Sequence, residues 1–391
     1  MNSKNKRVVI ITAFFNYDYE IRIKFLETYF EKKGFETEIV TSNFNHRNKI
    51  KYETNKENVT TIEVPVYEKN ISFKRIWSHY VFSKKVKKIC EEKKSELIYA
   101  ITPPNYIFSF LNKLKQKNVS PKLIFEIEDL WPESFPLHKT VKKALRLPLC
   151  IWKNIRDKNV SKADGIVFEC ELFEKYLTDR INFTCPIKTI YLSKNDELQN
   201  YCPSMIDNEI SILYLGSVNN LIDIDLIIKI LNAINNIKPV VLKIVGTGEK
   251  LEELEQKCLS NKLRYITYGA VYDENRKNEI LSNCNYALNI MKKTVFVGVT
   301  MKSLEYFHYG IPIINNIVGD TYKIVQREHC GFNITDECEV ADKICGLTIE
   351  EYEKISYNAR KVYNMHFSPV VFYEQITSFI NEIQERKNED V

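Results

Sequence analysis

The chain has 391 residues, of which 44% are hydrophobic and 27% charged, and its formal net charge at pH 7 is +5. The length fits two domains of similar size rather than one, and the composition excludes a disordered chain. No stretch approaches the roughly 20 consecutive apolar residues that a membrane span requires, and the N-terminal residues lack the pattern of a signal peptide. We therefore expect a cytoplasmic protein that is soluble or peripherally membrane-associated.

The charge is divided unevenly along the chain. Residues 1–195 contain 36 Lys and Arg against 23 Asp and Glu, a balance of +13, whereas the remaining residues have a balance of −8. This asymmetry indicates that the N-terminal half meets an anionic surface or ligand, although a lysine-rich composition explains it equally well. The ten cysteines form no CxxC pair, so we interpret them as reduced thiols that pack as small hydrophobic side chains.

Apolar runs and amphipathic segments follow one another along the chain, which predicts alternating strands and helices. The run 7–13 predicts a buried parallel strand, and residues 20–33 carry apolar side chains at helical spacing. The further strands are predicted at 37–42, 96–102, 122–129, 165–170, 188–193, 210–217, 240–248, 265–270, 286–291 and 311–316. Helices of the second half are predicted at 223–236, 248–260, 273–283 and 301–309.

Two successive strand–helix arrays predict an α/β protein with two Rossmann-like, doubly wound domains facing a cleft. The polar stretch 195–203 separates them, so we expect domains at 1–197 and 198–370. A C-terminal helix at 371–391 is expected to pack back towards the first domain. Open parallel sheets bind ligands at the carboxyl ends of their strands, and functional residues are therefore sought in the loops that follow strands.

The segment 300–314, TMKSLEYFHYGIPII, has the strongest chemical pattern. A helix that starts near Met301 presents unpaired backbone N–H groups and a positive dipole end, which suit a diphosphate. Lys302 adds positive charge at that end. Glu305 lies one turn further along, where its carboxylate is suited to accept two hydrogen bonds from a ribose diol. The alternative for Glu305 is an ordinary solvated helix carboxylate.

With this segment the chain resembles a known family. Residues 300–314 are similar to the K-x-x-E-Y-x-x-x-G-x-P signature of retaining family 4 glycosyltransferases, in the branch that makes bacterial capsule, exopolysaccharide and O-antigen. Residues 128–134, EDLWPES, are similar to the D-L-W-P-E-S element of that branch, and the Ala-Asp pair at 163–164 resembles a pair that the family places before a strand. Segments 213–217 and 244–249 are similar to the strands that open the family's nucleotide-sugar domain.

The resemblance implies a GT-B fold, with an acceptor-side first domain and a nucleotide-sugar-binding second domain. It implies a hexosyl- or N-acetylhexosaminyltransferase that moves a sugar from a nucleoside diphosphate sugar, most simply a UDP-sugar, to a lipid-linked or polysaccharide precursor with retention of configuration. Neither a metal nor another bound cofactor is expected, since the helix dipole and cations stabilise the leaving diphosphate, and no motif indicates a nucleic-acid partner.

The resemblance also implies the site residues. Those expected at the donor are Gly216, Ser217, Gly246, Val271, Tyr272, Lys292, Gly298, Val299, Thr300, Met301, Lys302 and Glu305. The expected catalytic residues are Asp129 and Glu128, which follow a predicted strand and are suited to act on the acceptor hydroxyl or an oxocarbenium-like centre. A structural alternative is that these carboxylates cap a helix that starts near Pro132.

The chain departs from the family pattern at three positions. The loop after the first strand has Phe15-Asn16-Tyr17-Asp18 where the family often has a glycine pair, and the other two departures lie on the donor side. The loop 216–220 lacks the Arg and Lys that many members place there, so we expect Lys302, Lys292 or Lys293 and backbone amides to neutralise the phosphates. Gly298 stands where many members have a second Glu, and its amide is expected to contact the donor sugar instead. Two alternatives stay open: a nucleotide-sugar 2-epimerase of the same fold, and a non-catalytic glycosyltransferase-like subunit.

A membrane-facing segment is predicted in the first domain. Residues 138–158 interleave basic and apolar side chains with Trp152, as in amphipathic helices that lie on an anionic surface. Residues 72–90 have a similar pattern, but there we favour an ordinary surface helix with a buried apolar face. We therefore expect the first domain to meet the inner face of the cytoplasmic membrane through residues 138–158.

Overall fold

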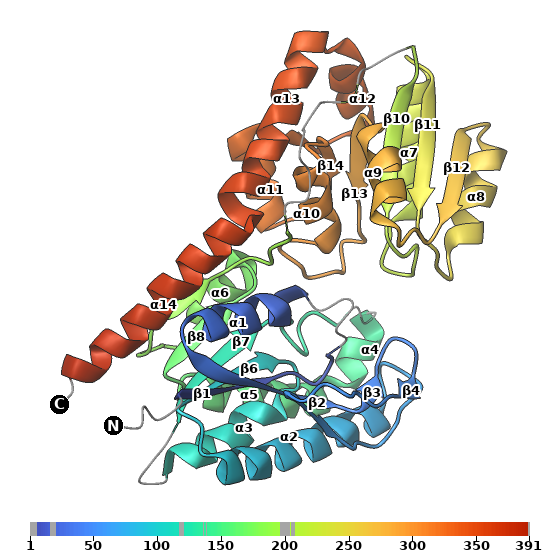
Figure 1. Cartoon of the computed structure of the whole chain (residues 1–391). Helices are drawn as coiled ribbons and strands as arrows, with labels where there is room; N and C mark the ends of the chain where they lie inside the picture. The colour runs from blue at the N-terminus through green and yellow to red at the C-terminus, as the bar shows by residue number, and fades with distance from the viewer. Residues whose placement is uncertain are drawn as a thin grey trace. The chain divides into compact units, whose positions relative to one another are not determined.

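The computed structural model describes residues 6–15, 21–116, 121–135, 137, 139–195, 204 and 208–389. The chain divides into two compact units, one formed by Met1–Ser193 with Phe372–Val391 and the other by Lys194–Val371. The boundary expected between residues 197 and 198 lies outside the described residues. Each unit contains a parallel sheet with helices on its faces (Figure 1), which confirms the prediction of two Rossmann-like α/β domains.

The sheet of the first unit has, within the described residues, seven parallel strands in the order β5-β2-β1-β6-β7-β8-β9. The strands are β1 (Lys6–Ile11), β2 (Phe35–Ser42), β5 (Val59–Ile62), β6 (Leu97–Thr102), β7 (Lys122–Ile127), β8 (Gly165–Phe168) and β9 (Ile187–Thr189). A short antiparallel hairpin of β3 (Phe44–Asn45) and β4 (Ile50–Lys51) follows β2. The strand order reverses between β1 and β6, and this is the position where doubly wound sheets bind ligands.

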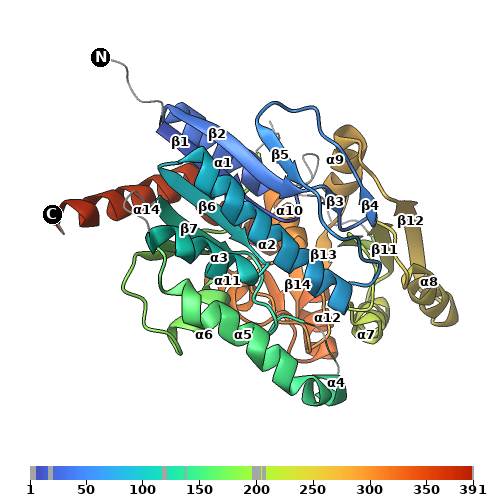
Figure 2. The ribbon, with the colours of Figure 1, turned by 90° about the horizontal axis from the view of Figure 1, so that it is seen from below.

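Helices cover both faces of this sheet. On one face lie α1 (Ile21–Lys32) and the C-terminal α14 (Pro369–Glu389), and on the other lie α2 (Phe73–Lys93), α3 (Tyr106–Asn112) and α5 (Arg146–Val160) (Figures 1 and 2). The remaining helical segments of the unit are η1 (Lys113–Gln116), α4 (Lys139–Ala144) and α6 (Glu171–Thr178). The amphipathic stretch 138–158 thus forms most of the two helices α4 and α5. Residue 138 lies outside the described residues.

The C-terminal helix completes the core of the first unit. Its apolar side chains pack with those of α1 against β1 and β6, and they are Phe372, Ile376, Phe379, Ile380 and Ile383. Gly165 in β8 allows this close approach, since a Cβ at that position would lie 2.5 Å from Ile383. A buried ion pair lies in the same layer: Nε of Arg22 is 2.6 Å from Oε1 of Glu126, and the Arg22 guanidinium is 4.9 Å from the Phe372 ring centroid.

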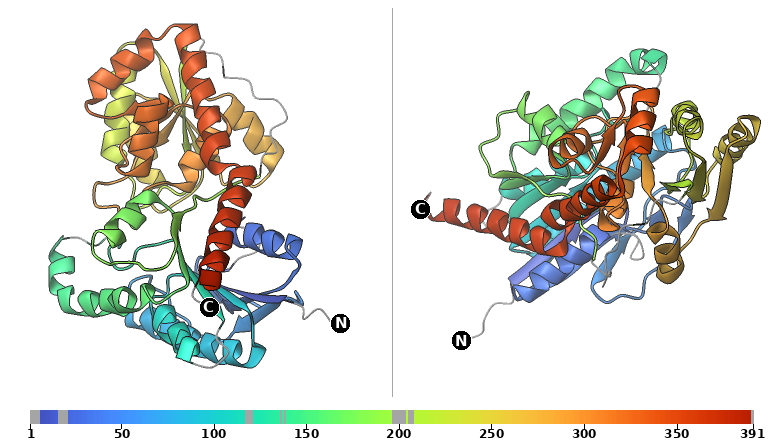
Figure 3. Two further views of the ribbon diagram at one scale, coloured as in Figure 1. Left: turned by 90° about the vertical axis from the view of Figure 1, so that its left-hand side faces the viewer. Right: turned by 90° about the horizontal axis from the view of Figure 1, so that it is seen from above.

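The sheet of the second unit has, over the described residues, six parallel strands in the order β12-β11-β10-β13-β14-β15. The strands are β10 (Ile210–Leu215), β11 (Val240–Val245), β12 (Arg264–Gly269), β13 (Tyr286–Asn289), β14 (Ile313–Asn315) and β15 (Gly331–Asn333). Its helical segments are α7 (Ile224–Asn235), α8 (Leu251–Ser260), α9 (Glu274–Ser282), α10 (Met301–His308), α11 (Asp320–Glu328), α12 (Glu337–Gly346), α13 (Ile349–Val362) and η2 (Tyr363–Phe367). They flank the sheet on both sides (Figure 3).

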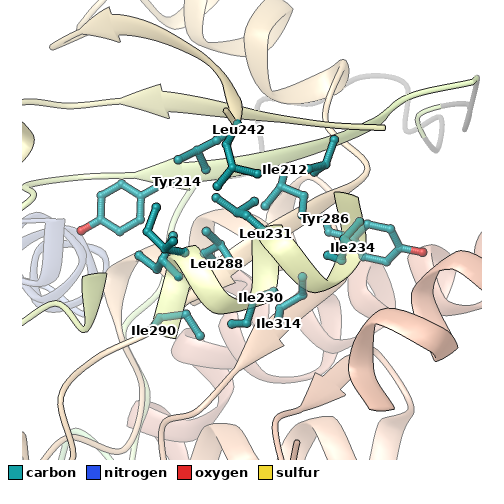
Figure 4. Packing of buried hydrophobic residues seen from close by; sticks show 14 of the residues in the cluster. Ile212, Tyr214, Ile230, Leu231, Ile234, Leu242, Tyr286, Leu288, Ile290 and Ile314 are labelled. Carbon is teal, nitrogen blue, oxygen red and sulfur yellow. The ribbon is translucent and has the colours of Figure 1, made fainter. Parts of the chain in front are cut away.

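The core of the second unit is built around α7, which is apolar on most of its surface. Ile230, Leu231 and Ile234 of this helix pack against strand residues such as Leu242 and Leu288 (Figure 4). Asp223 caps the helix, because its side chain accepts a hydrogen bond from the Leu226 N–H group at 3.1 Å. The strand order of this sheet reverses between β10 and β13, and the carboxyl ends of these two strands therefore mark the expected ligand position.

One local prediction is wrong. No helix begins near Pro132 in the described residues: residues 131–134 form a turn, and the next helix begins only at Lys139. The N–H group of Trp131 donates to the Asp129 carbonyl at 3.1 Å, and that of Ser134 to the Leu130 carbonyl at 2.9 Å. Within the described part of the chain, none of the helices combines the length and the apolarity needed to cross a membrane.

Candidate functional site

The N-terminus of α10 is fixed by a reciprocal cap. Oγ1 of Thr300 accepts from the Ser303 N–H group at 3.1 Å, and the Thr300 N–H group donates to Oγ of Ser303 at 3.2 Å. The carbonyl of Gly298, just before the cap, accepts from both N–H and Oγ1 of Thr321 at 3.0 and 2.6 Å. The first-turn N–H groups of Met301 and Lys302 have no acceptor inside the helix. These two groups and the positive helix end are therefore suited to an anion.

Tyr306 attaches α10 to the point where the strand order reverses. Its hydroxyl accepts from the Leu215 N–H group at the end of β10, at 2.9 Å, and donates to the Leu288 carbonyl in β13, at 3.3 Å. The phenol is fully buried, and burial raises its pKa well above the usual range. Tyr306 was not among the predicted site residues, although it follows Glu305 directly in the motif.

Lys302 lies beside Gly216 at the end of β10. Its Cδ is 3.7 Å from the position that a Cβ on Gly216 would occupy, and Nζ is 4.7 Å from the centroid of the Tyr214 ring. Burial lowers the pKa of Lys302 to about 8. No carboxylate of the described residues forms an ion pair with it. A partly buried ammonium group that has no counter-charge among the described residues, next to the first-turn amides of α10, is suited to bind a phosphate.

Three asparagines form a ladder across the carboxyl ends of neighbouring strands. Asn289, Asn315 and Asn333 are paired in register on β13, β14 and β15. Nδ2 of Asn289 donates to Oδ1 of Asn315 at 2.9 Å, and Nδ2 of Asn315 donates to Oδ1 of Asn333 at 2.7 Å. At one end Thr300 donates its hydroxyl to Asn289 at 2.8 Å, and at the other Asn333 donates to the Tyr322 carbonyl at 2.9 Å. The ladder therefore connects the α10 cap to α11.

Glu305 is held by two lysines. Its carboxylate is 2.6 Å from Nζ of Lys194 and 3.7 Å from Nζ of Lys277, and only 17% of the side chain is exposed. The alternative of an ordinary solvated carboxylate is therefore wrong. Burial lowers the pKa of Lys277, but Glu305 and then Glu274 outweigh that effect and raise it. Neither lysine was predicted from the sequence, because their proximity to Glu305 depends on the fold.

The other residues expected at the donor lie in loops at the same end of the sheet. Gly246 packs directly on Gly216, since a Cβ on Gly246 would lie 2.0 Å from the Gly216 carbonyl oxygen. Ser217 is exposed in the loop after β10. The Lys292 N–H group donates to the Leu221 carbonyl at 2.8 Å, which joins the loops after β13 and β10.

For three further residues expected at the donor, the structure gives the exposure of the side chain. Val299 is partly exposed between Gly298 and the α10 cap. Val271 is partly exposed and Tyr272 is 74% exposed, in the loop between β12 and α9. Within the described residues, no hydrogen bond, ion pair or ring contact joins Tyr272 to Lys302 or Glu305.

Asp129 lies in the first unit, after β7, and its carboxylate holds the following turn. Oδ2 accepts from Nε1 of Trp131 at 2.5 Å, and Oδ1 accepts from the Ser134 hydroxyl. Burial raises the pKa of Asp129, although these two hydrogen bonds act in the opposite direction. Glu128 is partly exposed, and its N–H group donates to the Thr102 carbonyl at 3.1 Å. Asp129 thus has the geometry of a positioning residue, whereas Glu128 presents part of its side chain to solvent.

A buried cation and two histidines lie next to this turn. The Arg75 guanidinium is 4.3 Å from the Trp131 ring centroid, and His79 stacks on the same indole at 5.4 Å. Burial, followed by the charge of Arg75, lowers the pKa of His46 to about 4 and that of His79 far below its usual range. Both histidines are therefore neutral at neutral pH. No motif or spacing in the sequence indicated this cluster.

The expectation that Trp152 lies at a membrane surface is wrong. Its side chain is only 7% exposed and packs against Trp131 and Phe135. Arg156 is also buried, and its guanidinium pairs with Glu133 at 2.7 Å. These contacts attach α5 to the turn that follows Asp129, so part of the predicted membrane-facing pattern is internal.

Comparisons with known proteins agree with this architecture. Residues 209–349 match the family described as Glycosyl transferases group 1. No curated protein matches the chain in sequence. The matched residues lie within the second unit, so the sequence likeness concerns that unit.

Several solved structures are similar over nearly the whole chain. A sucrose-phosphate synthase from Thermosynechococcus elongatus is 14% identical with a TM-score of 0.70, over 98% of this chain and 100% of that one. A glycosyltransferase from Rickettsia africae is 14% identical with a TM-score of 0.67, over 98% and 99%. Anabaena HepE in complex with UDP-glucose is 14% identical with a TM-score of 0.65, over 96% and 99%. At this identity the likeness shows the fold, which is of the GT-B type.

Proposed function

We propose that the protein is a glycosyltransferase that uses a nucleoside diphosphate sugar as donor. The observation that carries the proposal is Lys302, a partly buried cation without a carboxylate partner in the described residues, beside the first-turn amides of α10. The group 1 glycosyltransferase match of residues 209–349 supports it. UDP is the first candidate nucleotide, because the similar Anabaena protein was solved with UDP-glucose.

In the proposed reaction the second unit binds the donor and stabilises the leaving group. The amides of Met301 and Lys302, with the Lys302 ammonium group, take up the charge that develops on the diphosphate. Glu305 binds the ribose hydroxyl groups, with Lys194 or Lys277 keeping its carboxylate in place. These groups suffice for a metal-independent departure of the nucleotide, with a hexose or N-acetylhexosamine as the transferred sugar.

The first unit is proposed to bind the acceptor, a lipid-linked or polysaccharide precursor. Glu128 is proposed to act on the acceptor hydroxyl, and Asp129 to position it by holding the turn with Trp131 and Ser134. The family resemblance supports retention at the anomeric carbon and a role in surface-polysaccharide synthesis. A precursor of this kind is made at the cytoplasmic face of a membrane, so we propose peripheral membrane association.

A thermal-shift titration tests the donor site. At a hundredfold excess over Kd, a ligand of the native state adds about 2.7 kcal/mol, which raises the Tm of the second unit by roughly 5–10 °C. We expect this rise with UDP, and its loss in Glu305→Gln and Lys302→Met. Lys229→Met, an exposed lysine on α7, is the matched control and should keep it. No rise with UDP, GDP, TDP or CMP would contradict the proposal.

Product analysis separates the proposed transferase from the two alternatives. A transferase given donor without acceptor releases the free nucleoside diphosphate slowly by transfer to water. A 2-epimerase would return a nucleotide sugar with an altered sugar, and a non-catalytic subunit would return the donor unchanged. Chromatography of the nucleotide products after prolonged incubation distinguishes the three results.

A further inference from the structure

The start of α2 and the segments beside it expose an unusual set of large apolar side chains. Phe73 is 84% exposed and Trp77, one turn later, 57%. The set, which we name the α2 patch, consists of Ile50, Val66, Ile71, Phe73 and Trp77. Single exposed apolar residues are normal, but a group of them on one surface marks an interaction site.

A groove of about 680 Å³ shows that these segments lie together on the surface. Its lining comes from the β3–β4 hairpin, from residues 63–66 after β5, and from α2 itself. Val66 and Trp77 of the α2 patch are among its lining residues, as are three lysines, Lys51, Lys74 and Lys85. Glu63 is the acidic member of this lining.

The apolar surface of α2 exceeds what the core of the unit uses. The inner face of the helix is already buried through Phe82, Val86 and Cys90. Phe73 and Trp77 lie outside that buried set, and the Trp77 ring stacks on Tyr80 with centroids 5.4 Å apart. An indole and a phenol next to lysines are the side chains that favour the boundary between water and lipid.

We propose that the α2 patch inserts into the headgroup region of an anionic phospholipid bilayer. Charge complementarity selects this partner: the groove lining has three lysines against one glutamate, and residues 1–195 have a net charge of +13. Apolar insertion combined with attraction of lysines to anionic lipid is the usual basis of peripheral binding. This inference deepens the proposed function, because it gives the surface through which the enzyme reaches a membrane-bound acceptor.

A second exposed apolar surface with basic neighbours lies on the same face of the first unit as the α2 patch. Leu147 and Ile151 on α5 are 73% and 56% exposed, and α2 and α5 cover the same face of the sheet (Figure 2). Their basic neighbours Lys143 and Arg146 give this site a similar charge. Trp152 contributes nothing to it because it is buried. The proposal assigns the main insertion to the α2 patch.

Trp77 provides a specific optical test. The protein has three tryptophans, and the other two, Trp131 and Trp152, are only 5% and 7% exposed. With vesicles of phosphatidylglycerol and brominated phosphatidylcholine, we expect a blue shift and bromine quenching of tryptophan fluorescence. Both signals should vanish in Trp77→Phe. Vesicles of phosphatidylcholine alone should give a much smaller effect.

Vesicle sedimentation supplies the binding constant. Ile71→Ser/Phe73→Ser should weaken binding to the anionic vesicles at least tenfold, because two inserted apolar side chains are lost. Leu147→Ser/Ile151→Ser should have a smaller effect, and Leu259→Ser, 64% exposed in the second unit, should have none. Full binding by the α2 double variant, or binding lost only in the α5 variant, would overturn the proposal.

Two further results separate this inference from the proposed function. An unchanged thermal shift with UDP in the α2 double variant shows that the fold and the donor site are intact, so a loss of vesicle binding then belongs to the patch. If the wild-type protein ignores anionic vesicles but sediments as an oligomer that depends on Phe73, self-association replaces the membrane and the proposal is wrong. Failure of every nucleotide to bind would overturn the proposed function without affecting vesicle binding.

Discussion

Lys302 destabilises the fold that contains it. Water solvates an ammonium group far better than the surroundings of Tyr214 and Gly216 do, and burial therefore lowers the pKa of the folded lysine to about 8. Between that value and the usual value of 10.5, the unfolded chain binds the proton more tightly than the folded one. The free energy of unfolding therefore rises with pH through this window, and the full penalty is present below pH 8.

Lys302→Met should stabilise the protein and impair donor binding together. The methionine keeps the apolar contact with Tyr214 and Gly216, so we expect the free energy of unfolding at pH 7 to rise by on the order of 2 kcal/mol. Loss of a charged hydrogen-bond donor should weaken UDP binding roughly 10- to 100-fold. Denaturant unfolding and isothermal titration measure the two effects. A variant that is both less stable and unchanged in UDP affinity would contradict this assignment.

The same residue gives the donor affinity a pH dependence. UDP binding to the wild-type protein should weaken as pH rises through about 8, where the folded Lys302 loses its proton. The UDP affinity of Lys302→Met should lack this decline and stay low both below and above pH 8. The control is Lys229→Met, which should follow the wild-type curve.

At the scale of elements, the asparagine ladder holds α10 against the sheet. Each amide in it accepts from one neighbour and donates to the next, and Asn289 and Asn315 are fully buried. In such a chain every side-chain amide has a partner as long as all members are present, and loss of one member removes hydrogen bonds from its neighbours. The ladder is therefore a positioning device for the α10 N-terminus, because it ends on the hydroxyl of the Thr300 cap.

Asn289→Ala should break this device next to the cap. The change removes the hydrogen bonds of Asn289 to Oδ1 of Asn315 and to the Thr300 hydroxyl, at a cost of about 1 kcal/mol each. Oδ1 of Asn315 keeps its hydrogen bond from the Ile317 N–H group at 3.2 Å. UDP affinity should fall by more than tenfold, because the α10 amides and Lys302 are displaced from their native positions. UDP should still saturate the protein, because none of these groups is removed. Asn232→Ala removes a surface hydrogen bond between Asn232 on α7 and Asn261, which follows α8, and should alter neither property. Equal losses of affinity and stability in both variants would argue against a positioning role.

The helices and strands were predictable where apolar residues recur at regular spacing. The residues of the candidate site were predictable only in part. The helices α7 to α10 begin within three residues of their predicted starts, because their apolar faces are regular. The region after residue 316, including β15 and α11 to α13, carried no comparable motif. The asparagine ladder depends on the register between strands. The burial of Trp152 and Arg156 depends on which face of α5 packs against the unit. Neither can be read from spacing in a single sequence.

At the scale of the whole molecule, the last helix of the chain belongs to the first unit. The unit formed by Met1–Ser193 includes Phe372–Val391, and five apolar side chains of α14 lie in its core. Burial of one such side chain contributes about 1.5–3 kcal/mol, so the helix contributes an amount comparable to the whole stability of a domain, about 5–15 kcal/mol. The first unit therefore depends on residues 372–383 for its stability.

Phe379→Ala should for this reason destabilise the N-terminal half of the sequence. Phe379 is fully buried, and replacement of such a phenylalanine by alanine costs about 3–5 kcal/mol. Hydrogen-exchange mass spectrometry should then show faster exchange in β1, β6 and α1, of which the nearest, β6, ends at Thr102, 277 residues before Phe379, with β10, β13 and α7 unchanged. Val370→Ala changes a residue of the same helix that is 64% exposed and should leave both regions as they are. Removal of residues 372–391 should go further and abolish protection of the first sheet while the second unit still binds UDP. If the first sheet kept its protection after that removal, the assignment of α14 to its core would be wrong.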